Sequence, residues 1–261
     1  MLKFKYTGNH RIEVYDSVQD LPITRFQLYN LNMLLDAGIG SDLSAFVRHR
    51  QKISELMKTD LEAANIELVN LEQTIRFMMS KTNPEMNSFV VMIKTLNGRD
   101  LTDADMTEDG IKEIIKELGG NRFSLRNMRG LLETIKKKLD FEFETFFPVM
   151  TDDSKVKEFY SKLKKRSRLL LKKWIEKRDD VTEEIKKIDE FLIMSFKPKI
   201  YHGSQGVEVK MIKNFEDTCT MLELHNLTTD PKRLTTLSFY QKVETMKQIL
   251  KQQKKKNKKS K

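Results

Sequence analysis

The chain has 261 residues, which is long enough for one large or two small domains with a hydrophobic core. Hydrophobic residues make up 39% and charged residues 33%, which favours a helix-rich globular protein over a disordered chain, and the longest apolar runs are too short to cross a bilayer. The net charge of +10 points to acidic or phosphate-bearing partners, and the single cysteine, Cys219, excludes an internal disulfide and a multi-thiolate metal site.

The first elements predicted along the chain are a β-hairpin and a helix. Residues 2 to 15 alternate apolar and polar side chains around the turn sequence TGNH, a pattern typical of a β-hairpin. Because an isolated hairpin is marginally stable in water, we expect it to pack on another part of the chain. The next residues predict a helix with Asp20 as its cap, Pro22 in its first turn and Gly38 at its end.

The glycines after this helix raise the question of a phosphate-binding loop. Gly38 and Gly40 are followed by Ser41 and Asp42, but a dinucleotide loop needs a buried strand before its glycines, and here an amphipathic helix precedes them. A third glycine and the lysine of a P-loop are also missing. We therefore predict a joint between helices, in which Ser41 or Asp42 caps a helix that runs to about Lys58.

The following segments predict another helix and a mixed region. On the helix, apolar side chains recur at helical spacing and form one stripe. This stripe contains Leu61, Ala64, Leu68, Leu71, Ile75 and Met78. Residues 83 to 98 predict a short helix after Pro84, although their β-branched side chains leave a strand possible.

Residues 103 to 110, DADMTEDG, resemble a calcium-binding loop. Neither register of the loop supplies both the glycine at position six and the glutamate at position twelve. We therefore expect Asp105 or Thr107 to cap a helix that ends at Gly119 and Gly120. A further helix is predicted from residue 124 to residue 139. An aromatic cluster follows it, formed by Phe141, Phe143, Phe146 and Phe147 and closed by Pro148.

From Ser154 the sequence becomes strongly basic. Apolar residues recur at three- and four-residue steps as far as Leu192, which predicts one helix of about forty residues or two antiparallel helices with a break at 178–180. The segment from residue 155 to residue 178 contains eleven Lys or Arg residues and only two acidic residues. The candidate contact residues are Lys164, Lys165, Arg166, Arg168, Lys172 and Lys173. They form either a solvated coiled-coil face or a contact with nucleic acid or an acidic subunit.

The last part of the chain predicts a second hairpin, two helices and a tail. Residues 197–212 indicate a loop and a short β-hairpin, and helices are expected at about 214–226 and 234–250. The last eleven residues hold seven lysines, without which the net charge would be +3. We expect a flexible tail that either binds phosphate polyanions or serves only as a solubilising end. Its candidate residues are Lys254, Lys255, Lys256, Lys258 and Lys259.

Taken as one architecture, these elements predict a mainly α fold. The expected fold is a multi-helix bundle with a long basic coiled-coil-like helix or helical hairpin, an N-terminal β-hairpin and a short second hairpin. The expected units are residues 1–150 with the β-hairpin and a helical domain, residues 151–250 with the long helix and the second hairpin, and residues 251–261 as the lysine-rich tail.

The sequence contains no grouping of residues that indicates catalysis. The four histidines are His10, His49, His202 and His225. His49 lies between two arginines and is expected in solvent, and the spacing of His225 from Cys219 matches no zinc site. We expect Cys219 to be a small buried residue, and we expect the chain to be no enzyme and to bind no metal or cofactor.

One segment resembles a known group of proteins. Residues 13–53, EVYDSVQDLPITRFQLYNLNMLLDAGIGSDLSAFVRHRQKI, resemble the start of structural proteins of tailed bacteriophages, most of all the crAss-like phages of gut Bacteroides-type bacteria. The resemblance covers about forty of the 261 residues and carries no catalytic position. It implies a virion protein, such as a ring of the tail barrel or the head-to-tail region.

Such a protein would be assembled in the host cytoplasm and would pack in multiple copies. Its partners would be other virion subunits, copies of itself in a homo-oligomer, and DNA through its phosphates, and it would not contact a membrane. Two alternatives stay open. One is an accessory protein that binds nucleic acid through the basic helix and tail, and the other is an enzyme whose residues come together only in the folded chain.

Overall fold

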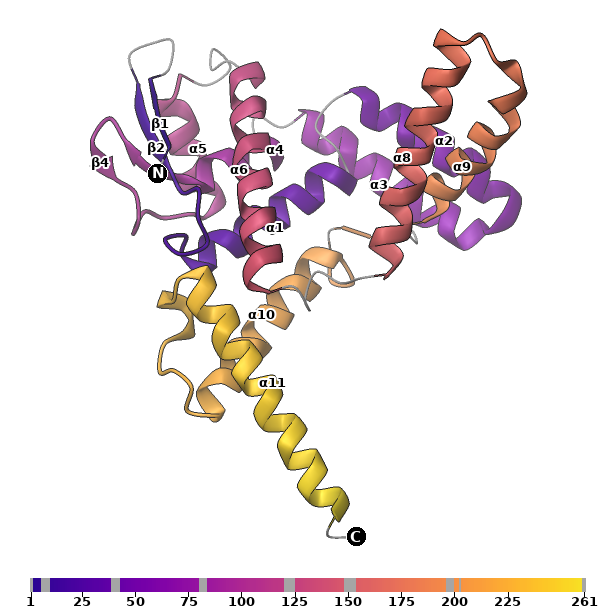
Figure 1. Cartoon of the computed structure of the whole chain (residues 1–261). Helices are drawn as coiled ribbons and strands as arrows, with labels where there is room; N and C mark the ends of the chain where they lie inside the picture. The colour runs from indigo at the N-terminus through magenta and orange to yellow at the C-terminus, as the bar shows by residue number, and fades with distance from the viewer. Residues whose placement is uncertain are drawn as a thin grey trace.

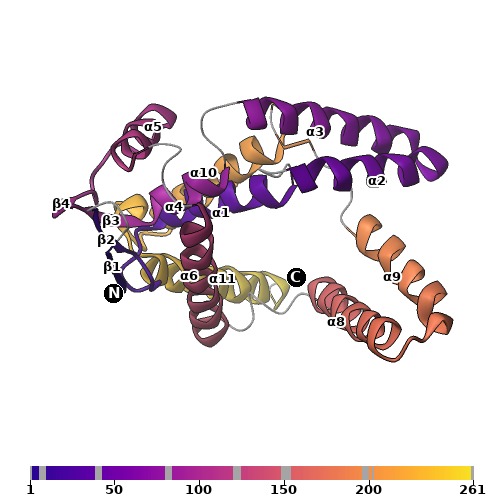
Figure 2. The same ribbon diagram turned by 90° about the horizontal axis from the view of Figure 1, so that it is seen from above.

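The computed structural model confirms a mainly α protein with a small antiparallel sheet near the N-terminus (Figure 1). The α-helices and strands arrange around a main hydrophobic core, and two helical hairpins extend away from it (Figure 2). The structure describes residues 2–5, 10–38, 43–79, 84–119, 125–147, 154–195, 200–201 and 203–259.

The predicted N-terminal β-hairpin is confirmed, and it packs on a second strand pair as expected. The strands follow the order β1-β2-β3-β4, each antiparallel to its neighbour. Ile12 lies opposite Leu96, and Val14 lies opposite Ile93, so the sheet joins the start of the chain to residues about eighty positions later. The turn at residues 6–9 lies outside the described residues. The strands are β1 (Leu2–Lys5), β2 (Arg11–Val14), β3 (Ile93–Leu96) and β4 (Arg99–Asp100).

The glycine pair near residue 40 connects two helices, as predicted. A helix ends at Gly38 and the next begins at Leu43, so no strand precedes the glycines. The proposed caps, Ser41 and Asp42, lie outside the described residues. The first helix starts later than expected, because Pro22 forms a β-bridge with Thr235. These helices are α1 (Ile23–Gly38) and α2 (Leu43–Thr59), and α3 (Leu61–Met79) follows.

Three further helices complete the N-terminal part. Residues 83–98 contain both predicted alternatives, because a helix ends at Val91 and β3 begins at Ile93. Thr107 caps the next helix and accepts a hydrogen bond from the Gly110 amide, so the acidic loop acts as a helix start. The third helix continues past residue 139 through most of the aromatic cluster. The helices are α4 (Pro84–Val91), α5 (Glu108–Glu117) and α6 (Leu125–Phe146).

A buried arginine ties α1 to the sheet. Arg25 is 2% exposed, and its guanidinium donates to the carbonyl oxygens of Val91, Ile93, Leu101 and Thr102. Burial lowers the pKa of Arg25, although nearby acidic groups oppose this effect. The Arg25 side chain therefore satisfies four carbonyl groups at once. It fixes α1 against β3 and against the residues that follow β4.

The main core joins both ends of the chain. Ile12, Phe89 and Ile135 share it with Leu222 and Phe239 from the last two helices. These helices therefore pack on the N-terminal elements, although they follow the boundary expected near residues 150–154, most of which lies outside the described residues. The two helices are α10 (Val207–Leu224) and α11 (Thr236–Lys259).

The predicted second β-hairpin at 197–212 is wrong, because α10 begins at Val207 directly after Gly206. The alternation of Val207 and Val209 extends over too few residues to define a strand. Farther along the same helix, Cys219 and Leu222 are three residues apart and both lie in the main core. This is the spacing of a helix face that packs on the core, and it differs from the two-residue spacing of a strand.

The basic segment folds into a helical hairpin, and the single forty-residue helix is wrong. A short 3-10 turn, Asp179–Val181, separates two helices at the predicted break. Leu169 packs against Val181, Ile185 and Ile188, a contact that forms only when the chain folds back. The helices are α8 (Ser154–Ile175) and α9 (Thr182–Met194).

The lysine-rich end continues α11 as helix up to Lys259. In Figure 1 this helix projects from the body of the molecule, with its lysine-bearing end farthest away. The segment expected as a flexible tail is therefore helical over most of its length, which holds its lysines at helical spacing.

Candidate functional site

Two of the predicted basic residues on α8 pair with acids of their own hairpin. Lys165 forms an ion pair with Glu184, and Arg166 forms one with Asp189. The basic and acidic residues belong to α8 and α9 respectively, so the charges hold the two helices together at their edges. The charges of Lys165 and Arg166 are therefore already paired within the hairpin.

The remaining basic residues of α8 differ in exposure. Arg168 and Lys172 are exposed, whereas Lys173 is half-buried. The side chain of Lys164 lies outside the described part of the structure, as do those of Lys254, Lys255, Lys256, Lys258 and Lys259. Arg168 and Lys172 are thus the predicted contact residues of α8 that present their charge to solvent.

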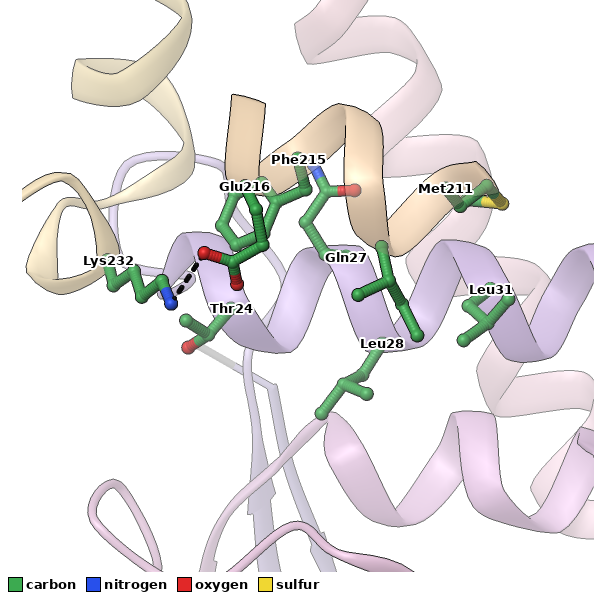
Figure 3. A pocket seen from close by; sticks show the side chains of 9 residues that line it. Thr24, Gln27, Leu28, Leu31, Met211, Phe215, Glu216 and Lys232 are labelled. Carbon is green, nitrogen blue, oxygen red and sulfur yellow. Dashed lines mark ion pairs between the residues drawn. The ribbon is translucent and has the colours of Figure 1, made fainter. Parts of the chain in front are cut away.

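An apolar cavity of about 240 Å³ lies between α1 and α10 (Figure 3). Most of its lining is apolar, and Gln27 adds an amide to one wall. Glu216 and Lys232 also line it, but they form an ion pair with each other at 2.8 Å. The cavity is smaller than most ligand sites, which measure about 300–1,000 Å³. Its apolar lining residues include Leu28, Leu31, Met211, Ile212 and Phe215.

His49 lies at the centre of a buried polar network, so its predicted exposure to solvent is wrong. Its side chain is almost fully buried between α2 and α3. Its Nδ1 lies 2.6 Å from Glu67 Oε1, and its Nε2 lies 3.0 Å from Thr74 Oγ1. Lys52 Nζ lies 3.2 Å from the second oxygen of Glu67. Successive residues of a helix point about 100° apart, so arginines on both sides of a histidine do not place it in solvent.

The carboxylate–imidazole–hydroxyl order of this network matches that of a hydrolase triad, but its surroundings do not. Thr74 is fully buried, so no substrate can reach its hydroxyl oxygen. That hydroxyl also donates to the carbonyl oxygen of Asn70, four residues earlier on the same helix. The network therefore acts as a polar core that sets the register of α2 against α3.

Glu67 is the charged centre of this network. Burial alone would raise the pKa of Glu67, but the hydrogen bond from His49 and the charge of Lys52 outweigh burial and lower it. Glu67 therefore stays ionised in the folded protein. Sequence reasoning missed the network, although Glu67, Asn70 and Thr74 recur at three- and four-residue steps and so mark a polar face on α3.

The apolar stripe predicted on α3 is largely exposed. Leu61 is 68% exposed, Leu68 45% and Ile75 39%. On α2, Met57 is 62% exposed. Of the predicted stripe, Ala64 is buried, and Leu71 and Met78 are half-buried. The α2–α3 hairpin thus buries a polar network beside a small apolar cluster of Leu56, Ala63 and Ala64, and it leaves larger apolar side chains on its surface.

Cys219 and the histidines are spread over the fold. Cys219 is buried in the main core, and burial, with the charge of Glu216, raises its pKa to about 11, so the thiol is protonated at neutral pH. His10 lies at the β-hairpin beside Asn97, and His225 ends α10. His202 lies outside the described residues. The described histidines therefore do not meet at one site.

A membrane-spanning helix and a metal-ion site are both absent from the described ranges. Within those ranges, no helix is both long enough and apolar enough to cross a bilayer. Over the same part of the chain, no three His, Cys, Asp or Glu side chains gather where a metal ion would be held.

No family model, curated protein or solved structure matches the chain.

Proposed function

We propose that this chain is a structural component of a tailed-phage virion, which packs in multiple copies in the tail or head-to-tail region. The observation that carries the proposal is the exposed apolar surface of the α2–α3 hairpin, at Met57, Leu61, Leu68 and Ile75. Large contiguous apolar surfaces are rare on monomers and mark sites where another molecule packs. The resemblance of residues 13–53 to phage structural proteins supports the same function.

The energetics favour coverage of this surface by protein. Full burial of a leucine or isoleucine side chain contributes about 1.5–3 kcal/mol, so several such residues together can stabilise an assembly contact. The hairpin has only Leu56, Ala63 and Ala64 in its own small apolar cluster. A neighbour that covers the outer face would supply the burial that the hairpin does not supply itself.

The test is the composition and mass of native particles. We expect the chain to co-purify with virions in several copies per particle, and to form a symmetric ring or layer in electron microscopy of those particles. The isolated chain should give a mass that is a multiple of the single chain. A chain that is monomeric at all concentrations and absent from particles would contradict the proposal.

A second candidate function is binding of nucleic acid as an accessory protein. It is favoured by the lysine-rich end of α11, which projects from the body, and by the exposed Arg168 and Lys172 on α8 (Figure 1). Cationic side chains on a helix bind phosphates without sequence preference, and the affinity falls steeply with salt.

The binding candidate is tested with two variants. Deletion of residues 251–261 removes seven lysines and should flatten the dependence of duplex affinity on salt. The double change Arg168→Glu and Lys172→Glu should weaken binding at low salt. Lys165→Ala serves as the control, because Lys165 pairs with Glu184 and a neutral residue there changes less of the exposed charge. Binding that is absent or insensitive to salt would remove this candidate.

A further inference from the structure

The exposed row on α3 has the spacing of a helix-packing seam. Leu61, Leu68 and Ile75 follow one another at intervals of seven residues, so they form one row along the helix. This row lies about a quarter to a third of a turn from Glu67 and Thr74, which face α2. The apolar row therefore flanks the contact with α2 and is available for a further neighbour.

A second row, half-buried at Phe46 and Ile53 and exposed at Met57, lies on α2. Phe46 and Ile53 are seven residues apart, and Met57 lies one turn beyond Ile53. They lie about a ninth to a quarter of a turn from His49 and Leu56, which are buried toward α3. Viewed along each helix from its N-terminus, the row is displaced in the same rotational direction from the side that faces the other helix. Because α2 and α3 run antiparallel, this places both rows on one side of the hairpin. This hairpin face consists of Phe46, Ile53 and Met57 on α2 and Leu61, Leu68 and Ile75 on α3.

The buried polar network makes this face a preformed surface. His49 contacts both Glu67 and Thr74, so it fixes how far α2 is shifted along α3. A single polar residue in a helix interface is enough to set register. Because the network holds the two rows side by side before any partner binds, less ordering is needed on association.

The charges at the edges of the hairpin face point to the kind of partner. Arg50 lies on the outer edge of α2, and Glu72 lies on the outer edge of α3, and both are exposed. They lie at the same height along the hairpin, since His49 contacts residues on both sides of Asn70. They are on opposite edges of one hairpin, so they cannot pair with each other within it.

We infer that the hairpin face packs against the same face of a second copy of this chain, across a two-fold axis parallel to the helices, to form a four-helix bundle. This arrangement places α2 of one copy against α3 of the other and brings Arg50 opposite Glu72 at both edges. A two-fold axis perpendicular to the helices would place Arg50 near Arg50 and Glu72 near Glu72. The inference rests on the proposed function, because it names one contact between copies. A two-fold contact joins the copies in pairs, and a second contact would join the pairs into a ring or layer.

The α8–α9 hairpin is a less suitable occupant of the hairpin face. Its buried apolar residues already face one another, at Leu169, Ile185 and Ile188, and the exposed Leu171 and Ile175 both lie on one helix, α8. Its ion pairs likewise join its own two helices. A second α2–α3 hairpin instead offers a row of the same length and spacing together with complementary edge charges.

The first experiment measures self-association of the full chain by sedimentation velocity. Leu68→Glu places a charge at the centre of the face, and we expect the dimer dissociation constant to rise on the order of a hundredfold, while circular dichroism stays unchanged. The control is Leu224→Glu, because Leu224 is 71% exposed at the end of α10 and should leave association unchanged. A chain whose association survives Leu68→Glu would overturn the inference.

The second experiment exchanges the edge charges. Arg50→Glu and Glu72→Arg should each weaken self-association about tenfold, and the double variant should restore it, because the opposite charges then meet again between copies. No rescue in the double variant would overturn the arrangement. If wild-type chains enter particles in multiple copies but neither Leu68→Glu nor the edge-charge variants change self-association, the inference fails and the proposed function stands. If the chain is monomeric and absent from particles, both fail.

Discussion

The α2–α3 and α8–α9 hairpins both expose large apolar side chains, on α8 at Leu171 and Ile175, but they differ in what lies between their helices. Between α8 and α9, Leu169, Val181 and Ile185 are buried, and the charged pairs lie at the edges. Between α2 and α3, His49 and Glu67 are buried, and leucine and isoleucine side chains face outward.

This difference indicates different roles for the two hairpins. A pair of helices that buries its own apolar residues is complete as a local unit, whereas a pair that exposes them gains stability only when another surface covers them. The polar contact between α2 and α3 defines one alignment, which is useful if the outer face must match a partner. The comparison therefore supports the proposal that α2–α3 is an assembly surface, whereas the apolar contact of α8–α9 is already made within that hairpin.

The largest expected effect is loss of the buried carboxylate between α2 and α3. Glu67→Ala leaves His49 and Lys52 without their acidic partner in a buried site, and we expect a loss of about 3–5 kcal/mol in the free energy of unfolding. Urea denaturation followed by circular dichroism measures it. Glu184→Ala is the matched control on the other hairpin, where an exposed ion pair contributes about 0–1 kcal/mol. Equal losses in the two variants would erase the distinction between the hairpins.

The next largest effect concerns the apolar core of the other hairpin. Ile185→Ala removes a buried side chain from the contact between α8 and α9 and should cost about 2–4 kcal/mol of local stability. Hydrogen exchange should show faster exchange in α8 and α9, with the amides of α2 and α3 unchanged. Faster exchange spread evenly over both hairpins would show that they are not separate units.

A smaller effect is expected from pH, and only in α2–α3. The pKa of Glu67 is lowered in the folded state from its ordinary value of 4.5, so its contribution to stability is fully present above that value. It is lost as the pH falls through the lower folded pKa, when the carboxylate facing His49 and Lys52 takes up a proton. The protection factors of the α2 and α3 amides should therefore fall below about pH 4.5, and Glu67→Gln should reduce this pH dependence.

The smallest effect is expected at the ionic edge of α8–α9. Lys165→Ala removes the pair with Glu184, in which both side chains are about half exposed, and should cost less than about 1 kcal/mol because solvent screens such pairs. Thermal unfolding in low and high salt measures it. A cost comparable to that of Ile185→Ala would mean that charge, rather than apolar burial, holds this hairpin together.

Features that depend on neighbouring residues were predicted well. The N-terminal β-hairpin, the connection after Gly38, the cap at Thr107 and the break at residues 178–180 all follow from turn, cap and periodicity signals within a few residues. These signals act locally because they satisfy backbone groups or set dihedral angles at the position where they occur.

Features that depend on distant residues were missed. The helix at residues 207–212 was predicted as a strand, because its link to the main core comes from residues farther along α10. His49 was expected in solvent, because its partners Glu67 and Thr74 lie on the next helix. The packing of α11 beside the N-terminal elements likewise depends on contacts across more than two hundred positions, such as the Thr236 hydroxyl donating to the Leu21 carbonyl.

The amino-acid sequence by itself determined the mainly α class, the positions of most helices and the concentration of positive charge in two segments. Periodicity and caps determine a helix from within its own residues, and charge depends on composition alone. Only the tertiary structure decided which side of each helix is buried, because that depends on which second helix lies against it. On α3 the buried side holds Glu67, Asn70 and Thr74 beside two small alanines, and the larger apolar residues Leu61, Leu68 and Ile75 lie on the surface.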